Sequence, residues 1–331
     1  MTTIFGGQPL NFKNQIIGGD FGTNPWQRGT SFTTISNTLT YTADRFWALG
    51  GASSSISVSR QTDAPSGFAN CLRFGRADAN ADTAAVNLGT VLTTERSLPL
   101  QGQNCVLSFW AKAGSGFSAA SGNLAVVLGT GTGSDESAAN FAAGSWTGYA
   151  ANLSTTQAIG TTWVRYSFPV TIPATATQVG VKFGFTPVGT ASSDYFQIEG
   201  VQLEIAQSVT PFERRPASIE LEMCQRFAYV IGEPASGVAI GSGMATSTTN
   251  ARITIPLPVS MRAAPTTTYT IGTLKANVAG SATTISALAT ATANTANNLN
   301  MDATTTGLTA GQASLLQGAG GTGSIVASAE L

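Results

Sequence analysis

The sequence of 331 residues predicts an all-β protein: an N-terminal jelly-roll β-sandwich, a short charged connector with helical spacing, and a C-terminal β-sandwich domain. Apolar and polar residues alternate along many short segments, which is the period of strands with one buried face. Clusters of Gly, Ser, Thr, Asn and Pro separate these segments and are typical of turns. No long helical period competes with this pattern, which favours a sandwich or barrel.

The expected strands begin with residues 53–60 and continue through residues 105–113, where Leu107, Phe109 and Ala111 share one face. These three side chains are expected to face the core, because successive residues of a strand point to opposite faces. The same alternation recurs in residues 124–129, 162–173, 178–185, 195–205 and 252–261.

Two changes of composition divide the chain. The strand series closes at residue 210, where a charged stretch begins, and only five charged side chains follow Pro234. The expected parts are an arm at residues 1–17, a jelly roll at 18–210, a connector at 211–232 and a C-terminal β domain at 233–331.

The connector concentrates charge in a chain of which only 10% is charged. Its spacing also suits a strand, but Ser218 as N-cap and two glutamates in the first turn favour a short helix. Exposed ion pairs contribute only about 0–1 kcal/mol each, so their expected role is to fix the register of a subunit or domain interface. The predicted interface residues, three of each sign, are Glu213, Arg214, Arg215, Glu220, Glu222 and Arg226.

The strand expected at residues 252–261 carries Pro256 and Pro258 on its polar phase. Proline lacks the N–H that a sheet partner would use. This strand is therefore expected at a sheet edge, at a bulge or against another chain.

Composition excludes several classes of function. The net charge of −1 provides no clustered positive surface, so no nucleic-acid partner is expected. No apolar run approaches the roughly 20 residues of a membrane helix, and the first residues lack a signal-peptide pattern, so no membrane insertion is expected. The chain has no histidine, which excludes histidine-dependent triads and His-ligated metal sites. Cys71, Cys105 and Cys224 form no C-x-x-C pair and are expected to be buried thiols.

A series of segments, in this order along the chain, resembles the landmarks of bacteriophage tail-fibre and virion-fibre proteins: IIGGDFGTNPWQRGTSF, YTADRFWALGG, LSFWAKAGSG, TTWVRYSFPVTIP, VQLEIAQSVTPFERRPASIELEMCQRF, PVSMRAAPT and ASAEL. The segments span nearly the whole chain, which makes the resemblance more specific than any one of them.

The resemblance implies a jelly roll of the carbohydrate-binding type at residues 18–210 and a structural, homotrimeric virion protein assembled in the host cytoplasm and exposed on the particle. Its implied partners are copies of itself, other virion proteins and bacterial surface polysaccharide, with residues 1–17 as the candidate for virion attachment. A capsid-bound head fibre or decoration protein is one alternative. A glycan-degrading tailspike enzyme is another.

Many carbohydrate-binding jelly rolls hold a structural calcium ion with acidic residues of the first and closing strands. Asp20 matches the first of these positions, and Glu199 stands where an aspartate pair would be expected. Calcium requires six to eight oxygen ligands, so no metal is predicted here, and no other cofactor is predicted.

Glycan binding requires flat rings beside polar groups, because the C–H face of a sugar packs on an aromatic ring. Trp26, Trp47, Trp110 and Trp163 are expected in the core. Residues 144–149 set a tryptophan and a tyrosine among small residues without alternating apolar support. The predicted glycan-binding residues are Trp146, Tyr149, Asp135, Glu136 and Asn140.

The loop LAVVLGTGTGSDES lacks the Lys-Ser/Thr of a nucleotide-binding loop and is expected to be a hairpin or surface loop. Asp135 and Glu136 are adjacent on it, whereas a glycosidase places its two carboxyl groups about 5 to 9 Å apart across a sugar. No catalytic residues are predicted, and the chain is expected not to be an enzyme.

Overall fold

The computed structural model describes residues 3–5, 8–10, 12–51, 56–77, 79–120, 122–278, 280–291 and 294–331. The chain divides into two compact units, Met1–Leu221 together with Leu331, and Glu222–Glu330. The division falls within residues 211–232, where the sequence predicts a connector. Strands dominate both units, and the predicted all-β class with two sandwiches is confirmed.

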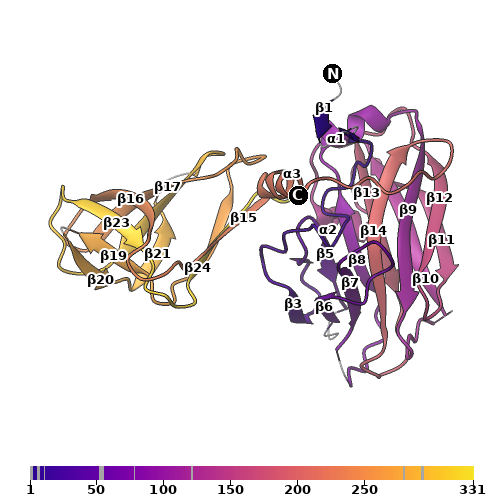
Figure 1. Cartoon of the computed structure of the whole chain (residues 1–331), viewed down its shortest axis with the longest axis horizontal. Coiled ribbons are helices and arrows are strands. Elements are labelled where there is room, and N and C mark those ends of the chain that lie inside the picture. The colour runs from indigo at the N-terminus through magenta and orange to yellow at the C-terminus, as the bar shows by residue number, and fades with distance from the viewer. Residues whose placement is uncertain are drawn as a thin grey trace. The chain divides into compact units, whose positions relative to one another are not determined.

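The first unit is a sandwich of two six-stranded antiparallel sheets (Figure 1), with strand orders β11-β10-β13-β8-β5-β4 and β12-β9-β14-β7-β6-β3. The strands of the first sheet are β4 (Thr40–Tyr41), β5 (Trp47–Leu49), β8 (Val86–Val91), β10 (Asn123–Gly131), β11 (Ala150–Ala158) and β13 (Gln178–Phe185). Those of the second are β3 (Ser31–Ile35), β6 (Ile56–Gln61), β7 (Cys71–Arg76), β9 (Asn104–Ala113), β12 (Val164–Thr171) and β14 (Tyr195–Ile205).

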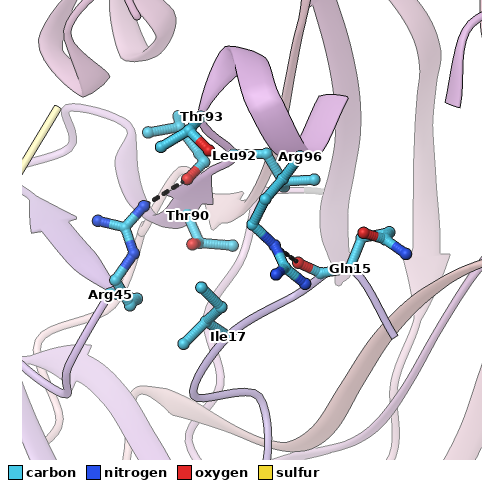
Figure 2. A pocket seen from close by; sticks show the side chains of 8 residues that line it. Gln15, Ile17, Arg45, Thr90, Leu92, Thr93 and Arg96 are labelled. Atoms are coloured by element: carbon cyan, nitrogen blue, oxygen red, sulfur yellow. Dashed lines mark hydrogen bonds between the residues drawn. The ribbon is translucent and has the colours of Figure 1, made fainter. Parts of the chain in front are cut away.

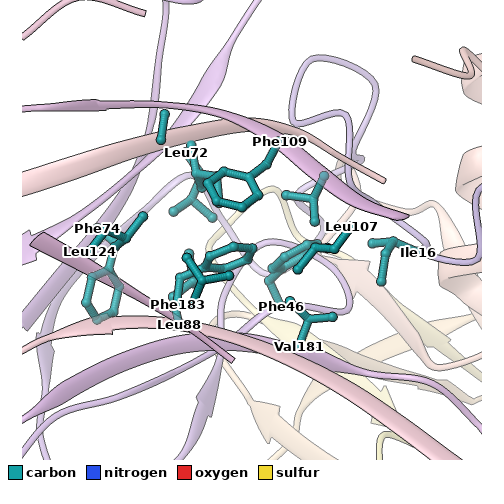
Figure 3. Packing of buried hydrophobic residues seen from close by; sticks show 14 of the residues in the cluster. Ile16, Phe46, Leu72, Phe74, Leu88, Leu107, Phe109, Leu124, Val181 and Phe183 are labelled. Atoms are coloured by element: carbon teal, nitrogen blue, oxygen red, sulfur yellow. The ribbon is translucent and has the colours of Figure 1, made fainter. Parts of the chain in front are cut away.

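The core of this unit lies between the two sheets (Figure 3). Leu107, Phe109 and Ala111 of β9 are fully buried in it, as the alternation predicts. The Phe109 ring meets that of Phe183 from the opposite sheet edge to face, with centroids 4.8 Å apart. Burying a side chain such as Phe109 contributes about 1.5–3 kcal/mol, so this phase of β9 is strongly fixed, and the other phase must face outward.

Short helices complete the first unit and the connector: α1 (Thr94–Ser97), η1 (Leu98–Leu100), α2 (Ala138–Ala143) and α3 (Ala217–Gln225). The helix predicted in the connector is therefore confirmed, but its start is not at Ser218. Glu220 N–H donates to Pro216 O, so the first turn already contains Ser218, which is not its N-cap.

The second unit contains a three-stranded sheet, β15-β24-β18, and a seven-stranded sheet, β20-β19-β23-β16-β17-β22-β21. Its strands are β15 (Ala228–Gly232), β16 (Ala239–Ala245), β17 (Asn250–Pro256), β18 (Thr266–Thr270), β19 (Lys275–Val278), β20 (Ser281–Thr284), β21 (Ala287–Thr290), β22 (Asn298–Thr304), β23 (Ala313–Gln317) and β24 (Ser324–Ser328).

The predicted edge position of the proline-bearing strand is wrong. β17 lies between β16 and β22, with Ile253 and Ile255 buried on the apolar face. Pro256 is the last residue of the strand, and Pro258 follows it. The two missing N–H donors therefore lie at the end of the hydrogen-bond ladder, so β17 can occupy an interior position in the sheet.

The N-terminal arm contains a hairpin of β1 (Thr3–Phe5) and β2 (Gln8–Leu10). The attachment role predicted for residues 1–17 falls partly on residues 1, 2, 6, 7 and 11, which lie outside the described ranges. Asn14 is buried. Its side-chain Nδ2 donates to Val201 O at 3.1 Å, and its Oδ1 accepts from Leu203 N–H at 3.1 Å, both in β14. The end of the arm is thus part of the jelly roll.

Two smaller expectations concern thiols and membranes. Cys71, Cys105 and Cys224 are buried thiols, as predicted. Burial raises the pKa of Cys71 to about 12 and that of Cys105 to about 11, so both thiols are poor nucleophiles. Within the described ranges, no helix combines the length and the apolar character of a membrane span.

Candidate functional site

The ring of Trp146 is packed inside the first unit. It is 3% exposed, its centroid lies 4.7 Å from that of Phe141, and its Nε1 donates to Ser137 O at 3.0 Å. The expectation that its loop lacks apolar support is therefore wrong. Ala138 and Phe141 of α2 provide that support, because i and i+3 residues share one face of a helix. The buried cluster comprises Trp47, Val91, Ala138, Phe141, Trp146 and Leu331.

The other predicted glycan residues hold this loop in shape. Glu136 accepts bonds from Thr147 N–H and from Thr147 Oγ1, each at 2.9 Å, and Asp135 accepts from Thr94 N–H at 2.7 Å. Asn140 is exposed, and Tyr149 is partly buried, which raises its pKa. A glycan contact in this loop stays a prediction, but the carboxylates already have backbone partners.

The predicted interface residues separate into two groups. Glu213, Arg215 and Glu220 are internal to the first unit: Arg215 Nη1 donates to Ile16 O at 3.1 Å and pairs with Glu220 at 3.2 Å. Glu213 Oε2 accepts from Asn14 N–H at 2.8 Å. These three residues tie the connector to the N-terminal segment within one chain, where little of their charge meets solvent.

The remaining interface residues lie nearer the surface. Glu222 and Arg226 are exposed in the second unit and line an open hollow of about 420 Å³ with Met223, Val259 and Met261. A subunit contact there stays a prediction. Arg214 belongs to a different feature.

A groove of about 510 Å³ opens on the outer face of the second sheet of the jelly roll. We call it the aromatic–arginine groove. It is lined by three rings, two guanidinium groups, one serine and a short segment of the connecting loop: Phe68, Trp110, Phe212, Arg165, Arg214, Ser66 and residues 209–211. Its size suits a small ligand, since such sites usually have volumes of about 300–1,000 Å³.

Strand pairing brings the first two groups of the groove together. β9 lies between β12 and β14 (Figure 1), and Trp110 is directly opposite Arg165. Both side chains occupy the outward phase, and the guanidinium carbon of Arg165 lies 4.5 Å from the centroid of the Trp110 ring. Cross-strand neighbours of this kind stabilise a sheet by roughly 0.2–1 kcal/mol, and here they also orient the guanidinium.

The expected core position of Trp110 is therefore wrong, because the ring is partly exposed on the face opposite Leu107 and Phe109. Trp163 is also partly exposed and lies beside Lys112, 5.3 Å from its ring centroid. Trp26 and Trp47 are buried, as expected.

A glycine lets the rings of the groove approach the sheet. The register of β14 shifts between Glu199 and Gln202, and Gly200 in this bulge has φ +61°. A Cβ at Gly200 would lie 2.6 Å from Trp110 Cε3 and 3.0 Å from Phe68 Cζ. Glycine therefore provides both the left-handed conformation and the space for these rings.

The third ring and the second arginine come from other segments. The ring centroid of Phe68 lies 5.0 Å from that of Trp110 and 5.4 Å from that of Phe212. Arg214 lies over Phe68, with its guanidinium carbon 4.4 Å from the ring centroid, and its Nη1 is 3.6 Å from Asp20 Oδ2. Each guanidinium of the groove is thus backed by an aromatic face.

The acidic pair behind the groove does not resemble a calcium site. Glu199 accepts from Gly200 N–H at 2.8 Å and Phe21 N–H at 3.1 Å, while Asp20 accepts from Gly22 N–H at 2.9 Å. N–H donors and Arg214 thus take the oxygens that an ion would need. Burial, followed by repulsion from Asp20, raises the pKa of Glu199 well above its usual value. Among the described residues, no group of three His, Cys, Asp or Glu side chains is arranged to hold a metal.

A second hollow in this unit is too small for a sugar (Figure 2). It has room for about 10 Å³, roughly one water molecule, between Arg45 and Arg96. Arg45 Nη2 donates to Val91 O at 2.7 Å, and Arg96 Nε donates to Gln15 O at 3.1 Å. Arg45 thus bonds strand β8, and Arg96 joins helix α1 to the N-terminal segment.

The sequence contained part of the signal for the groove. Trp110 and Arg165 each fall on the polar phase of a predicted strand, which indicates an outward position. Neither Phe68 nor Phe212 lies in such a pattern, and nothing in the sequence indicates that they meet Trp110.

Comparisons with known proteins gave likenesses of structure. No protein-family model matches the chain. A search of curated proteins also found no match. Solved structures similar to the chain include the enzymatically active domain of tailspike protein 4 of bacteriophage CBA120, at 14% identity and a TM-score of 0.36, covering 59% of this chain and 22% of that one.

Carbohydrate-binding modules are also among the similar structures. The C-terminal family 22 module of Clostridium thermocellum Xyn10B is 17% identical, with a TM-score of 0.33, and covers 53% of this chain and 98% of that one. The family 11 module of the same organism, solved with a β-1,3-1,4-mixed-linked tetrasaccharide, is 10% identical, with a TM-score of 0.32, and covers 54% and 98%. Similarities at these TM-scores do not indicate the function of this chain.

Proposed function

We propose that this protein is a structural component of a bacteriophage virion, a tail fibre or spike exposed on the particle, that binds polysaccharide on the bacterial surface. The aromatic–arginine groove carries the binding part of the proposal. The virion part is supported by the ordered segments that resemble phage fibre proteins.

The groove has the two kinds of group that sugar recognition needs. Trp110, Phe68 and Phe212 supply aromatic surface, and Arg165, Arg214 and Thr210 supply hydrogen-bonding groups beside it. Aromatic rings contribute contact area at low entropic cost, and fixed polar groups orient the ligand. The sheet orders Trp110 and Arg165 before binding, so little side-chain conformational entropy is lost when a ligand binds.

The experiment compares binding of wild-type and Trp110→Ala protein to host cells and to purified host polysaccharide. Loss of one ring is expected to weaken binding about tenfold, a cost of about 1.4 kcal/mol. Tyr269→Ala is the matched control, because it removes a ring that is 41% exposed in the second unit. Unchanged binding by folded Trp110→Ala protein would exclude the groove as the glycan site.

We further propose that the protein binds polysaccharide without cleaving it. The sequence has no histidine, and the adjacent Asp135 and Glu136 bond backbone N–H groups in their loop. Release of reducing ends from host polysaccharide by the purified protein would favour the tailspike-enzyme alternative instead.

The assembly and location are part of the same proposal. A homotrimer is expected, with Glu222 and Arg226 among its contacts, and a monomeric mass in light scattering at micromolar concentration would contradict it. Antibody labelling of intact virions separates a tail fibre from the alternative of a capsid-bound head fibre or decoration protein.

A further inference from the structure

Arg165 lines the groove and has no carboxylate partner among the described residues. Its Nη2 donates to Ser108 Oγ at 3.1 Å and Thr210 O at 2.7 Å, both of which are neutral. Its buried Nε has no hydrogen-bond partner among the described residues. Both hydrogen bonds use Nη2, and Nη1 has no partner among the described residues, so the guanidinium retains N–H groups that a ligand can bond.

Glu204, whose charge acts on Arg165, is already satisfied by other partners. Glu204 accepts from Thr210 N–H at 3.0 Å, Thr210 Oγ1 at 2.6 Å and Gln202 Nε2 at 2.9 Å. Burial lowers the pKa of Arg165, and the negative charge of Glu204 only partly opposes this. Burial thus disfavours the charged form of Arg165 to some extent, and no carboxylate among the described residues forms a direct ion pair with it.

The described residues that line the groove include two charged side chains, Arg165 and Arg214, and both are positive. Arg214 is paired with Asp20, while Arg165 has no such pair among the described residues. Glu199 lies behind the floor, where burial raises its pKa and so disfavours its charged form. An anionic group in the groove would be attracted by Arg165, and no carboxylate is found among the described residues that line the groove.

We infer that the groove selects acidic saccharides, whose sugar carboxylate is bound by Arg165 while the sugar ring contacts Phe68 or Phe212. The inference rests on the proposed glycan-binding function and specifies its ligand class. A guanidinium is planar and always charged, and its N–H groups match the two oxygens of a carboxylate. Trp110 behind Arg165 holds the plane of the guanidinium in place.

The test uses matched pairs of polysaccharides that differ only in charge: polygalacturonate, alginate and hyaluronate oligomers, each beside its carboxyl-reduced form. Calorimetric titration of the wild-type protein is expected to give at least one pair in which the carboxylated form binds about tenfold or more tightly, the loss typical of one hydrogen bond to a charged group. Arg165→Gln is expected to remove this preference, and Arg165→Lys, which keeps the charge without the planar fork, to retain part of it.

Arg73→Gln is the matched control. Arg73 is an arginine stacked 4.1 Å from a tyrosine ring, that of Tyr195, on strand β7 of the same sheet, but it does not line the groove. This variant is expected to keep the preference. A preference lost equally in Arg73→Gln and Arg165→Gln would reflect general charge attraction and would overturn the assignment to Arg165.

The outcomes separate the inference from the function on which it rests. Equal binding of the carboxylated and reduced forms would overturn the acidic-sugar inference and leave glycan binding intact. Absence of binding to either form of all three oligomers and to host polysaccharide would overturn both. A preference that survives in folded Arg165→Gln protein would also overturn the inference.

Discussion

Replacing Gly200 with alanine tests how the groove is built. The residue has φ +61°, a conformation that costs an L-residue about 1–2 kcal/mol. The new Cβ would also lie 2.6 Å from Trp110 Cε3, so the ring must move. Overpacking of this kind costs about 1–3 kcal/mol. The two effects together predict that Gly200→Ala lowers the free energy of unfolding of the first unit by about 2–5 kcal/mol.

A second glycine separates the two costs. Gly122 has φ +68°, but a Cβ there would have no heavy atom within 4 Å. Gly122→Ala is therefore expected to carry the backbone cost alone, about 1–2 kcal/mol. The difference between the two variants measures the clash with the ring.

Urea unfolding followed by tryptophan fluorescence suits this comparison, because all five tryptophans precede residue 164 and so belong to the first unit. Gly200→Ala is also expected to weaken glycan binding, whereas Gly122→Ala is not. Equal destabilisation by the two variants, together with wild-type binding by Gly200→Ala, would refute the argument that the missing Cβ gives the rings their place.

Three further predictions address the acidic group behind the groove, the connector and the aromatic loop. Because burial raises the pKa of Glu199, the folded protein keeps a proton that the unfolded chain releases above about pH 4, so stability falls as pH rises. The urea midpoint of the wild type should therefore fall relative to Glu199→Gln between pH 4 and pH 8; parallel midpoints would contradict the raised pKa. Arg215→Ala leaves the Glu220 carboxylate buried without its partner and should cost about 3–5 kcal/mol in the same unfolding assay, and a loss below 1 kcal/mol would count against a buried anchor. Trp146→Ala should lower the free energy of unfolding by about 3–5 kcal/mol. Host-cell binding per folded molecule of this variant tests the glycan contact predicted for Trp146. Because the ring is 3% exposed, we expect this binding to be unchanged.

The sequence alone determined the secondary structure of the regions that matter most. A period of two fixed the inward phase of β9, since moving Leu107 and Phe109 to the other face would expose both. The sequence also indicated a helix in the connector, through the helical spacing of that stretch. These features are local, because each depends on residues within a few positions of one another.

The sequence failed where the deciding partner is distant. The density of charge in the connector was visible, but Arg215 is buried because it bonds the backbone of Asn14 and Ile16, about 200 residues away in the sequence. The prolines suggested a sheet edge, although Pro256 occupies the end of an interior strand. Trp146 looked unsupported because its partner Phe141 lies on a helix of only six residues, too short for a clear period.

The groove shows the same limit. Trp110 was expected in the core, although it and Arg165 lie on the polar phase of their strands. Only the order of strands in the sheet places β12 beside β9 and so sets the two side chains opposite each other. Phe68 and Phe212 then reach the same ring from two loops, across a bulge where Gly200 leaves room. A local pattern determines which face of its strand each side chain occupies. A binding site requires side chains from several segments to meet, and the packing of segments far apart in the chain decides which of them do.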